Sequence, residues 1–386
     1  ISRYITRLEK REIEVNFADY FAEAKEGKVF KQAELAATLK LIRDKGQDGF
    51  YKGKTAKTIA QFMQQHGGII SETDLANYTA KSRTPIKADW NGFEVLTSPP
   101  PSSGGIAILQ WLKMFELLKP EQGLELNSTT YVHLLAEIGK RVFADRAEYL
   151  GDPDFFDVPV AALTNNEYLK KRSSTISLNA ISTTENIKPG LKESEQTTHF
   201  SIVDTMGNAV ANTTTINLGF GSGVVVEGAG FLLNDEMDDF SAKPGVMNAF
   251  GALGGVANEI QPQKRMLSSM TPSILLKDNT VQMVTGSPGG TTIISSVYQS
   301  ILNAIEFNLN AEQVVNSPRF HHQLLPKDTI RVHPGFDEST LAELTDMGYT
   351  IDARRFGDVH LIKRTSQGVE AASEASGRGK SIVSAR

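Results

Sequence analysis

The stretch that decides the fold is a pair of strand-like runs joined by a short polar turn. Residues 195–203 read Glu-Gln-Thr-Thr-His-Phe-Ser-Ile-Val, and residues 209–217 read Ala-Val-Ala-Asn-Thr-Thr-Thr-Ile-Asn. In the first run the apolar Phe200 and Ile202 alternate with polar neighbours, which is the period of a half-buried strand. The residues between the runs, Asp-Thr-Met-Gly-Asn, have the composition of a turn. The pattern predicts an antiparallel β-hairpin centred on Met206.

The register of this hairpin brings two threonines together at its open end. Partners in a hairpin are equidistant from its centre, so Thr197 is predicted to lie opposite Thr215, and a bulge would shift the pairing by one residue. Cross-strand threonine pairs are ordinary sheet stabilisation. Two facing hydroxyls can also serve a reaction. The pattern alone leaves both interpretations open.

Composition excludes several classes of function. The chain has 386 residues, 40% hydrophobic and 22% charged, which is the composition of a soluble globular protein with one large or two ordinary domains. The net charge of −5 is mild and dispersed, which argues against a nucleic-acid partner. No apolar run is long enough to cross a bilayer. Cysteine is absent, so thiol nucleophiles, thiolate metal sites and disulfides are impossible.

Periodicity elsewhere predicts helices and strands in mixed order. Strand character is predicted for residues 87–98 and 351–364. Residues 173–196 are rich in Ser, Thr, Glu and Lys and are predicted to form an exposed loop before Thr197. Helical spacing marks residues 33–44, 55–65, 106–118, 127–150, 291–307 and 341–347. In the helix over 127–150, a charged group is predicted to form a solvated or ion-paired flank: Lys140, Arg141, Asp145, Arg146 and Glu148.

Many long motifs, in the same order along the chain, resemble the γ-glutamyltransferase (γ-glutamyl transpeptidase) family of the N-terminal nucleophile (Ntn) hydrolases. The likeness runs from about residue 32 to about residue 375. The resemblance implies an α+β fold, the four-layer αββα sandwich of that superfamily. The motifs are Phe-Tyr-Lys-Gly (50–53), Pro-Pro-Pro-Ser-Ser-Gly-Gly (99–105), Asp-Arg-Ala-Glu-Tyr-Leu-Gly-Asp-Pro (145–153), Thr-Thr-His-Phe-Ser-Ile-Val-Asp (197–204), Gly-Phe-Leu-Leu-Asn (230–234), Met-Asp-Asp-Phe-Ser (237–241), Lys-Arg-Met-Leu-Ser-Ser-Met-Thr-Pro (264–272), Gly-Ser-Pro-Gly-Gly (286–290) and Pro-Arg-Phe-His-His-Gln (318–323).

The resemblance implies that Thr197 is a nucleophile that this chain exposes by cutting its own Gln196–Thr197 bond. A threonine hydroxyl reacts poorly without a base, and a liberated α-amine on the same residue can act as that base. Residues 1–196 would then be the C-terminal part of a large subunit whose upstream portion is missing here, and residues 197–386 a small subunit. Both halves are expected to form one folded unit. Thr215 would hydrogen-bond the hydroxyl of Thr197 and orient it.

The turn Gly-Ser-Pro-Gly-Gly directly before a predicted helix is a candidate oxyanion site. Glycines allow backbone N–H groups to approach a ligand, and a helix N-terminus favours negative charge. Gly289 and Gly290 are the predicted donors. A phosphate-binding loop is the rival interpretation, but it requires a lysine after the last glycine and this chain has Thr291 there.

An acidic turn and a serine pair are the candidate substrate site. On composition alone, residues 235–239 (Asp-Glu-Met-Asp-Asp) are a solvated turn; a calcium site is disfavoured because the EF-hand spacing is absent. The resemblance implies that the α-ammonium group of a glutamyl substrate is held by one set of residues and its α-carboxylate by another. The ammonium set is Asn217, Glu236 and Asp239; the carboxylate set is Ser268 and Ser269.

Two further segments complete the candidate residues. Residues 244–255 match the lid loop of bacterial members, with Phe250 in the place where a tyrosine is common, and their glycines suit a mobile flap. His321 and His322 are adjacent, and neighbours on a strand point to opposite faces, so no metal is assigned to them.

The sequence therefore predicts a self-processing enzyme without a cofactor. It would transfer the γ-glutamyl group of glutathione or another γ-glutamyl amide to water, an amino acid or a peptide, as a large and small subunit heterodimer. The alternatives are a related Ntn acylase or polyglutamate-cleaving enzyme, and a non-catalytic truncated remnant. The first residues are not a signal peptide, and the resemblance implies a periplasmic or secreted location.

Overall fold

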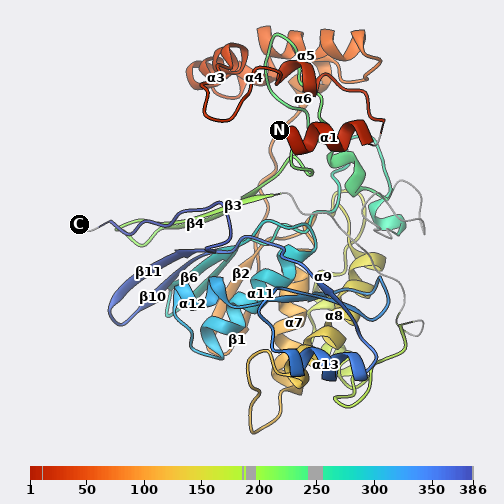
Figure 1. Ribbon diagram of the computed structural model, residues 1–386, viewed down its shortest axis with the longest axis vertical. Coiled ribbons are helices and arrows are strands. Elements are labelled where there is room, and N and C mark those ends of the chain that lie inside the picture. The colour runs from red at the N-terminus through yellow and green to blue at the C-terminus, as the bar shows by residue number, and fades with distance from the viewer. Residues whose placement is uncertain (11, 185–186, 188–196, 242–254, 385–386) are drawn as a thin grey trace. The chain divides into compact units, whose positions relative to one another are not determined.

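The computed structural model describes residues 1–384 apart from residues 11, 185–186, 188–196 and 242–254 (Figure 1). The chain divides into two compact units. One comprises Ile1–Arg83 with Ile216–Asp235, and the other comprises Thr84–Thr215 with Glu236–Arg386. Each unit therefore combines chain from before and after the predicted cleavage point, and the boundary between the two subunits stays a prediction. No helix among the described residues has the length and apolarity needed to cross a membrane.

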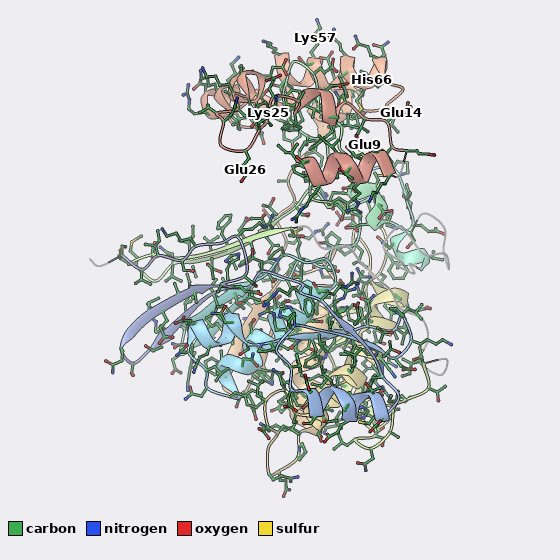
Figure 2. The ribbon with its side chains drawn as sticks, in the orientation of Figure 1. Glu9, Glu14, Lys25, Glu26, Lys57 and His66 are labelled. Atoms are coloured by element: carbon green, nitrogen blue, oxygen red, sulfur yellow. The ribbon has the colours of Figure 1, made fainter. Side chains whose placement is uncertain are left out.

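The first unit is helical and is closed by the segment that follows the hairpin. Ile59 and Phe62 of one helix pack against Val226 and Ala229 of that segment. Thr38 Oγ1 donates to the carbonyl oxygen of Ala229 at 2.8 Å. The side chains labelled in Figure 2 are exposed charged or polar groups of this unit. Its helices are α1 (Ser2–Lys10), α2 (Phe17–Tyr20), α3 (Ala33–Lys45), α4 (Asp48–Tyr51), α5 (Gly53–Gln65) and α6 (Glu72–Asn77).

The second unit is built on a six-stranded antiparallel sheet in the order β1-β2-β5-β6-β10-β11. The strand predicted over residues 87–98 is instead two strands, because Asn91 and Gly92 adopt φ values of 49° and 78° and make a two-residue turn. The strands are β1 (Ile86–Trp90), β2 (Phe93–Thr97), β5 (Ser273–Lys277), β6 (Thr280–Gly286), β10 (His360–Thr365) and β11 (Gly368–Ser373).

Helices cover one face of this sheet. α7 (Gly104–Leu118), α8 (Thr129–Tyr149) and α11 (Thr292–Ile305) supply most of the large apolar core. Ser128 caps α8 by accepting from the backbone N–H of Tyr131. The smaller elements of this unit are α9 (Val160–Leu163), α10 (Asn166–Ser173), α12 (Ala311–Asn316), α13 (Glu338–Asp346), the 3₁₀ turns η2 (Glu236–Asp239) and η3 (Val256–Asn258), and a three-stranded sheet of β7 (Phe320–His322), β8 (Thr329–Val332) and β9 (Thr350–Ala353).

The charged residues of α8 correct one prediction. Lys140, Arg141, Asp145 and Arg146 are all no more than 4% exposed, so they are not a solvated flank; Glu148 is exposed. The first three are nevertheless in ion pairs, as the other half of that prediction expected. They are buried because α8 is enclosed by neighbouring elements nearly all round, which its own periodicity could not reveal.

The predicted hairpin forms the layer on the other face of the sheet. β3 (Thr198–Val203) and β4 (Ala209–Thr214) pair antiparallel and lie over β6 and β10, opposite the helices (Figure 1). Helices, sheet and hairpin are thus three successive layers of the second unit. The α+β class predicted from the sequence is confirmed.

Candidate active site

The hairpin register is the one that the sequence predicts. Thr198 is paired with Thr214, and the pairing continues residue by residue, without a bulge, to Val203 and Ala209. Continued by one residue, this register sets Thr197 opposite Thr215. Thr197 is partly buried, and its carbonyl oxygen accepts from Nη2 of Arg378 at 3.1 Å.

His199 holds the hairpin against the sheet. Its Nδ1 lies 2.8 Å from Thr213 Oγ1, and its Nε2 lies 3.0 Å from Ser201 Oγ. A β-carbon placed on Gly286 would lie 2.2 Å from the Cε1 atom of His199, so the ring rests directly on the end of β6. Burial, and next the neighbouring His360, lower the pKa of His199 to about 3, so the ring is neutral at pH 7. No role was predicted for His199. The alternating pattern set the apolar Phe200 and Ile202 on the face opposite to His199, yet they are 44% and 52% exposed, whereas His199 is the buried side chain because this face of the hairpin lies on the sheet.

The glycine turn follows directly from the strand that His199 touches. Gly289 and Gly290 have φ values of 133° and 58°, a conformation that L-residues with side chains rarely adopt, and they immediately precede α11. The Ser287 hydroxyl accepts from the backbone N–H of Asp358 at 3.0 Å and donates to the carbonyl of Pro288 at 2.7 Å, which fixes the start of the turn. Backbone N–H groups at the N-terminus of a long helix favour a developing negative charge.

A cavity of about 430 Å³ lies beside the hairpin and the turn. Its lining includes Thr198 of β3, Pro288 of the glycine turn, and Asp358, His360 and Arg378. The start of β3, the glycine turn and the C-terminal segment therefore border one space.

The two predicted carboxylate-binding serines belong to a second, tightly bonded group. The backbone N–H of Ser268 donates to the carbonyl of Pro101 at 2.8 Å, and the backbone N–H of Ser103 donates to the carbonyl of Ser268 at 2.7 Å. Arg146, only 4% exposed, donates to Ser103 Oγ at 2.9 Å and to Ser269 Oγ at 3.1 Å. Arg146 was predicted to be a flank residue; the structure places its guanidinium against the serine pair.

The acidic turn is joined to this serine group by one side chain. Glu236 and Asp239 lie in η2 and are partly buried. Asn258 Nδ2 donates to the carbonyl of Asp239 at 2.7 Å, while its Oδ1 accepts from the backbone N–H of Leu267 at 2.9 Å. Asn258 thus connects the acidic turn to the residue before Ser268. Nothing in the sequence pattern singled it out.

The two remaining predicted site residues are Asn217 and Phe250. Asn217 belongs to the first unit, where it adopts a φ of 69° and donates from Nδ2 to the carbonyl of Asp235 at 3.2 Å. Phe250 and most of the predicted lid lie outside the described residues.

Both histidines of the adjacent pair are buried and make hydrogen bonds inside the protein. His321 lies 2.6 Å from Ser295 Oγ through Nδ1 and 2.9 Å from Gln323 Oε1 through Nε2. His322 Nδ1 lies 2.7 Å from the carbonyl of Thr329. Burial lowers the pKa of His321 to about 3 and that of His322 to about 4. Within the described ranges, no group of three or more His, Asp or Glu side chains is arranged to hold a metal ion.

Comparison with known proteins gives a consistent result. A family model described as Gamma-glutamyltranspeptidase matches residues 1–384. A glutathione hydrolase proenzyme of Pseudomonas aeruginosa is 54% identical over 373 residues, covering 95% of this chain and 67% of that protein. The glutathione hydrolase proenzyme of Escherichia coli is 48% identical over 330 residues, covering 85% and 57%. The crystal structure of cephalosporin acylase from Bacillus halodurans is similar with a TM-score of 0.81 at 26% identity, covering 95% of this chain and 66% of that one.

The chain spans only part of the length of these relatives, but the match extends over nearly all of the chain itself. The motifs that carry it include the hairpin, the glycine turn and the serine pair described above. The chain therefore belongs to the gamma-glutamyltranspeptidase family.

Proposed function

We propose that this chain is the catalytic part of a self-processing γ-glutamyltransferase that acts on glutathione or other γ-glutamyl amides. The contact between His199 and Gly286 supports this most directly. It ties the strand that follows Thr197 to the strand that leads into the glycine turn. Acyl transfer needs a nucleophile and oxyanion donors held in a fixed relation, and this contact supplies such a relation.

Self-cleavage comes first in the proposed sequence. The Thr197 hydroxyl oxygen attacks the carbonyl carbon of Gln196; a C–O bond forms, the C–N bond breaks, and the hydroxyl proton passes to the nitrogen of Thr197. Water then hydrolyses the ester to the Gln196 carboxylate and a free hydroxyl. Thr215 hydrogen-bonds the hydroxyl of Thr197 and orients it. The product has a large subunit ending at Gln196 and a small subunit beginning at Thr197.

Turnover uses the amine that cleavage has liberated. An α-amine has an ordinary pKa of about 7.7–8.0, close to working pH, so it can accept the hydroxyl proton as Thr197 attacks the γ-carbonyl of the donor. Gly289 and Gly290 donate to the oxyanion. The proton then goes to the leaving amine, and water or an acceptor amine releases the γ-glutamyl group from its ester. The reaction requires no cofactor.

Substrate recognition rests on groups of opposite polarity. Asn217, Glu236 and Asp239 are assigned to the α-ammonium group of the donor, and Ser268 and Ser269 to its α-carboxylate. Because Ser269 Oγ accepts from the buried Arg146, the O–H of Ser269 is oriented as a donor. Phe250 is assigned to the lid. By analogy with the family, the processed heterodimer is periplasmic or secreted.

Intact-mass spectrometry and an assay with a γ-glutamyl anilide test the proposal together. We expect the purified chain to yield two species split between Gln196 and Thr197 and to release the aniline. Thr197→Ala should remain one uncut and inactive species. Cleavage in that variant contradicts the assignment, and a wild-type chain that is never cut and never turns over substrate is a non-catalytic remnant.

An acylase is the second candidate, because the structural likeness to cephalosporin acylase covers 95% of this chain. The same preparation can be assayed with a glutaryl amide, which lacks the α-ammonium group. Faster turnover of the glutaryl amide than of the γ-glutamyl anilide would favour the acylase. Glu236, Asp239 and the serine pair favour the γ-glutamyl donor.

A further inference from the structure

A row of polar side chains runs along the side of α11 that meets β7. Thr291, Ser295 and Gln299 are no more than 2% exposed and stand four positions apart, so they lie one above another on the same side of the helix. We call these three residues the polar row. The buried side of a helix normally carries apolar side chains, and buried polar groups cost free energy unless they are hydrogen-bonded. The polar row therefore needs partners on β7.

Two members of the polar row are bonded directly to β7. Gln299 Nε2 donates to the carbonyl of Phe320 at 2.7 Å, and the backbone N–H of Phe320 donates to Gln299 Oε1 at 3.2 Å. Ser295 Oγ lies 2.6 Å from Nδ1 of His321, the next residue of the strand. These bonds fix how far α11 can slide along its own axis, because a shift of one turn would leave each of them unmade. Apolar contacts would not be specific in this way.

Gln323, just after β7, is the point where the remaining bonds converge. Its Oε1 accepts from Thr291 Oγ1 at 2.8 Å and lies 2.9 Å from His321 Nε2, while its Nε2 donates to the carbonyl of Leu325 at 3.0 Å. Burial lowers the pKa of His321 to about 3, so its ring is neutral, with one donor and one acceptor. His321 therefore donates to Gln323 from Nε2 and accepts the Ser295 hydroxyl at Nδ1. These bonds leave the Gln323 amide one orientation.

The glycine turn ends one residue before Thr291. Glycine has more conformational freedom than any other residue, so Gly289 and Gly290 cannot by themselves hold their N–H groups in one direction. The N–H groups of Thr292 and Ile293 already donate to the carbonyls of Gly289 and Gly290. Donors for an oxyanion must then come from the turn itself. Their direction depends on what holds the two ends of the turn.

Different segments hold those two ends. At the upstream end, the Ser287 hydroxyl accepts from the backbone N–H of Asp358 at 3.0 Å. At the downstream end, Thr291 occupies the cap position of α11, but its side chain accepts no capping hydrogen bond from the helix. Its hydroxyl donates to Gln323 instead. A threonine cap contributes about 1 kcal/mol to a helix, so the bond to Gln323 replaces a stabilising interaction that α11 could have had.

We propose that Gln323 is a positioning residue for the reaction: through its bond to Thr291 it fixes the downstream end of the glycine turn, so that the N–H groups of the turn stay aimed at the oxyanion. His321 acts behind it by fixing the orientation of the Gln323 amide. Gln323 does not touch the reacting atoms. The inference rests on the proposed function, because it concerns the oxyanion donors of that same site. It also gives the histidine-containing motif over residues 318–323 a part in acyl transfer.

Thr291→Val is the direct test, because it removes the bond to Gln323 and keeps the shape of the side chain, whereas Thr291→Ser keeps the hydroxyl. Loss of an oxyanion donor lowers kcat about 100-fold to 1000-fold, and a donor that is displaced but present should cost less. We expect the kcat of the fully cleaved Thr291→Val protein with a γ-glutamyl anilide to fall roughly tenfold. Thr291→Ser should keep most of the wild-type kcat. Ser300→Ala removes another buried hydroxyl of α11, outside the polar row, and is the control with wild-type kcat.

An inhibitor pair separates positioning from a general loss of structure. In a glutamate analogue with a boronic acid in place of the γ-carboxyl group, boron bonds to the Thr197 hydroxyl oxygen and becomes a tetrahedral anion, which requires the oxyanion donors. Glutamate itself binds without forming that anion. We expect Thr291→Val to weaken inhibition by the boronate roughly tenfold and to leave inhibition by glutamate unchanged. Equal weakening of both inhibitors marks a merely structural role and overturns the proposal.

Gln323→Met provides a second route and a test of the contact itself. It keeps the length of the side chain and removes the amide, so its kcat should be at least as low as that of Thr291→Val. Because both substitutions break one bond, the double variant should be no slower than Gln323→Met alone. Losses that multiply in the double variant overturn the proposal, as does a wild-type kcat in Thr291→Val. A wild-type chain that is neither cut nor active contradicts the proposed function itself.

Discussion

The imidazole of His199 lies so close to Gly286 that no side chain could be added there without displacing one of them. His199 stands two residues after Thr197, and Gly286 stands three residues before Gly289. The glycine therefore lets the hairpin approach the sheet at the point where the predicted nucleophile and the predicted oxyanion donors must be held in register.

Gly286→Ala should disturb the hairpin more than the rest of the protein. A methyl group placed 2.2 Å from the His199 ring has to move the ring, and overpacking of this kind costs about 1–3 kcal/mol. We expect self-cleavage and turnover to fall by at least roughly tenfold, measured by intact mass and the anilide assay. A smaller side chain should make room, so His199→Ala in the Gly286→Ala background should restore part of the activity. Failure of that rescue would show that the two residues do not act through this contact.

Thr215→Val tests the hydroxyl that is predicted to orient Thr197. The substitution keeps the shape of the side chain and removes only the hydrogen bond, so the cleaved enzyme should lose about tenfold to a hundredfold in kcat. Thr214→Val is the matched control, because neighbours along a strand face opposite sides and Thr214 is exposed. Equal effects of the two substitutions on kcat would contradict the assignment.

Arg146→Lys should weaken donor binding. Arg146 reaches Ser103 from Nε and Ser269 from Nη2, and the single ammonium of lysine lacks this planar fork, so the serine pair should be less firmly oriented. A bond from a charged donor contributes about 1.5–3 kcal/mol, which predicts a rise in the KM for the donor of roughly tenfold to a hundredfold, with kcat much less affected. Steady-state kinetics with a γ-glutamyl anilide provide the measurement. An unchanged KM would remove Arg146 and Ser269 from the binding site.

Acid should destabilise the protein through its buried neutral histidines. The pKa of His199 is lowered from its ordinary 6.5 to about 3, chiefly by burial, so between these values the unfolded chain binds a proton that the folded chain does not. The free energy of unfolding therefore falls as the pH drops below 6.5, by up to about 1.4 kcal/mol per pH unit for this group. Urea unfolding at pH 7 and pH 5 measures the slope. His199→Asn should flatten it, and an identical slope in the variant would show that other groups are responsible.

The local elements follow from short-range pattern, and the errors occur where distant residues or turn geometry intervene. The period of two and the polar turn centred on Met206 were sufficient to predict the hairpin and its register, but not which face is buried, since Phe200 and Ile202 are exposed and His199 is buried. Residues 87–98 were predicted as one strand, although Asn91-Gly92 is a strong signal for a tight turn. Lys140 and Arg141 were assigned to a flank because the residues that surround them, Ser182 and Asp328, lie more than 40 and 180 positions away.

The sequence by itself determined the family, the α+β class, the strand that begins after Thr197 and the glycine turn at Gly289 and Gly290. Each of these depends on motifs or periodic patterns formed by residues that are close together along the chain. The tertiary structure alone decided that Arg146 meets Ser269, that His199 rests on Gly286, and that Lys140 and Arg141 bond to Ser182. These contacts join segments far apart along the chain. Which residues meet in these contacts is set by how the helices and strands pack, and the periodicity of side chains along the sequence does not reveal that packing.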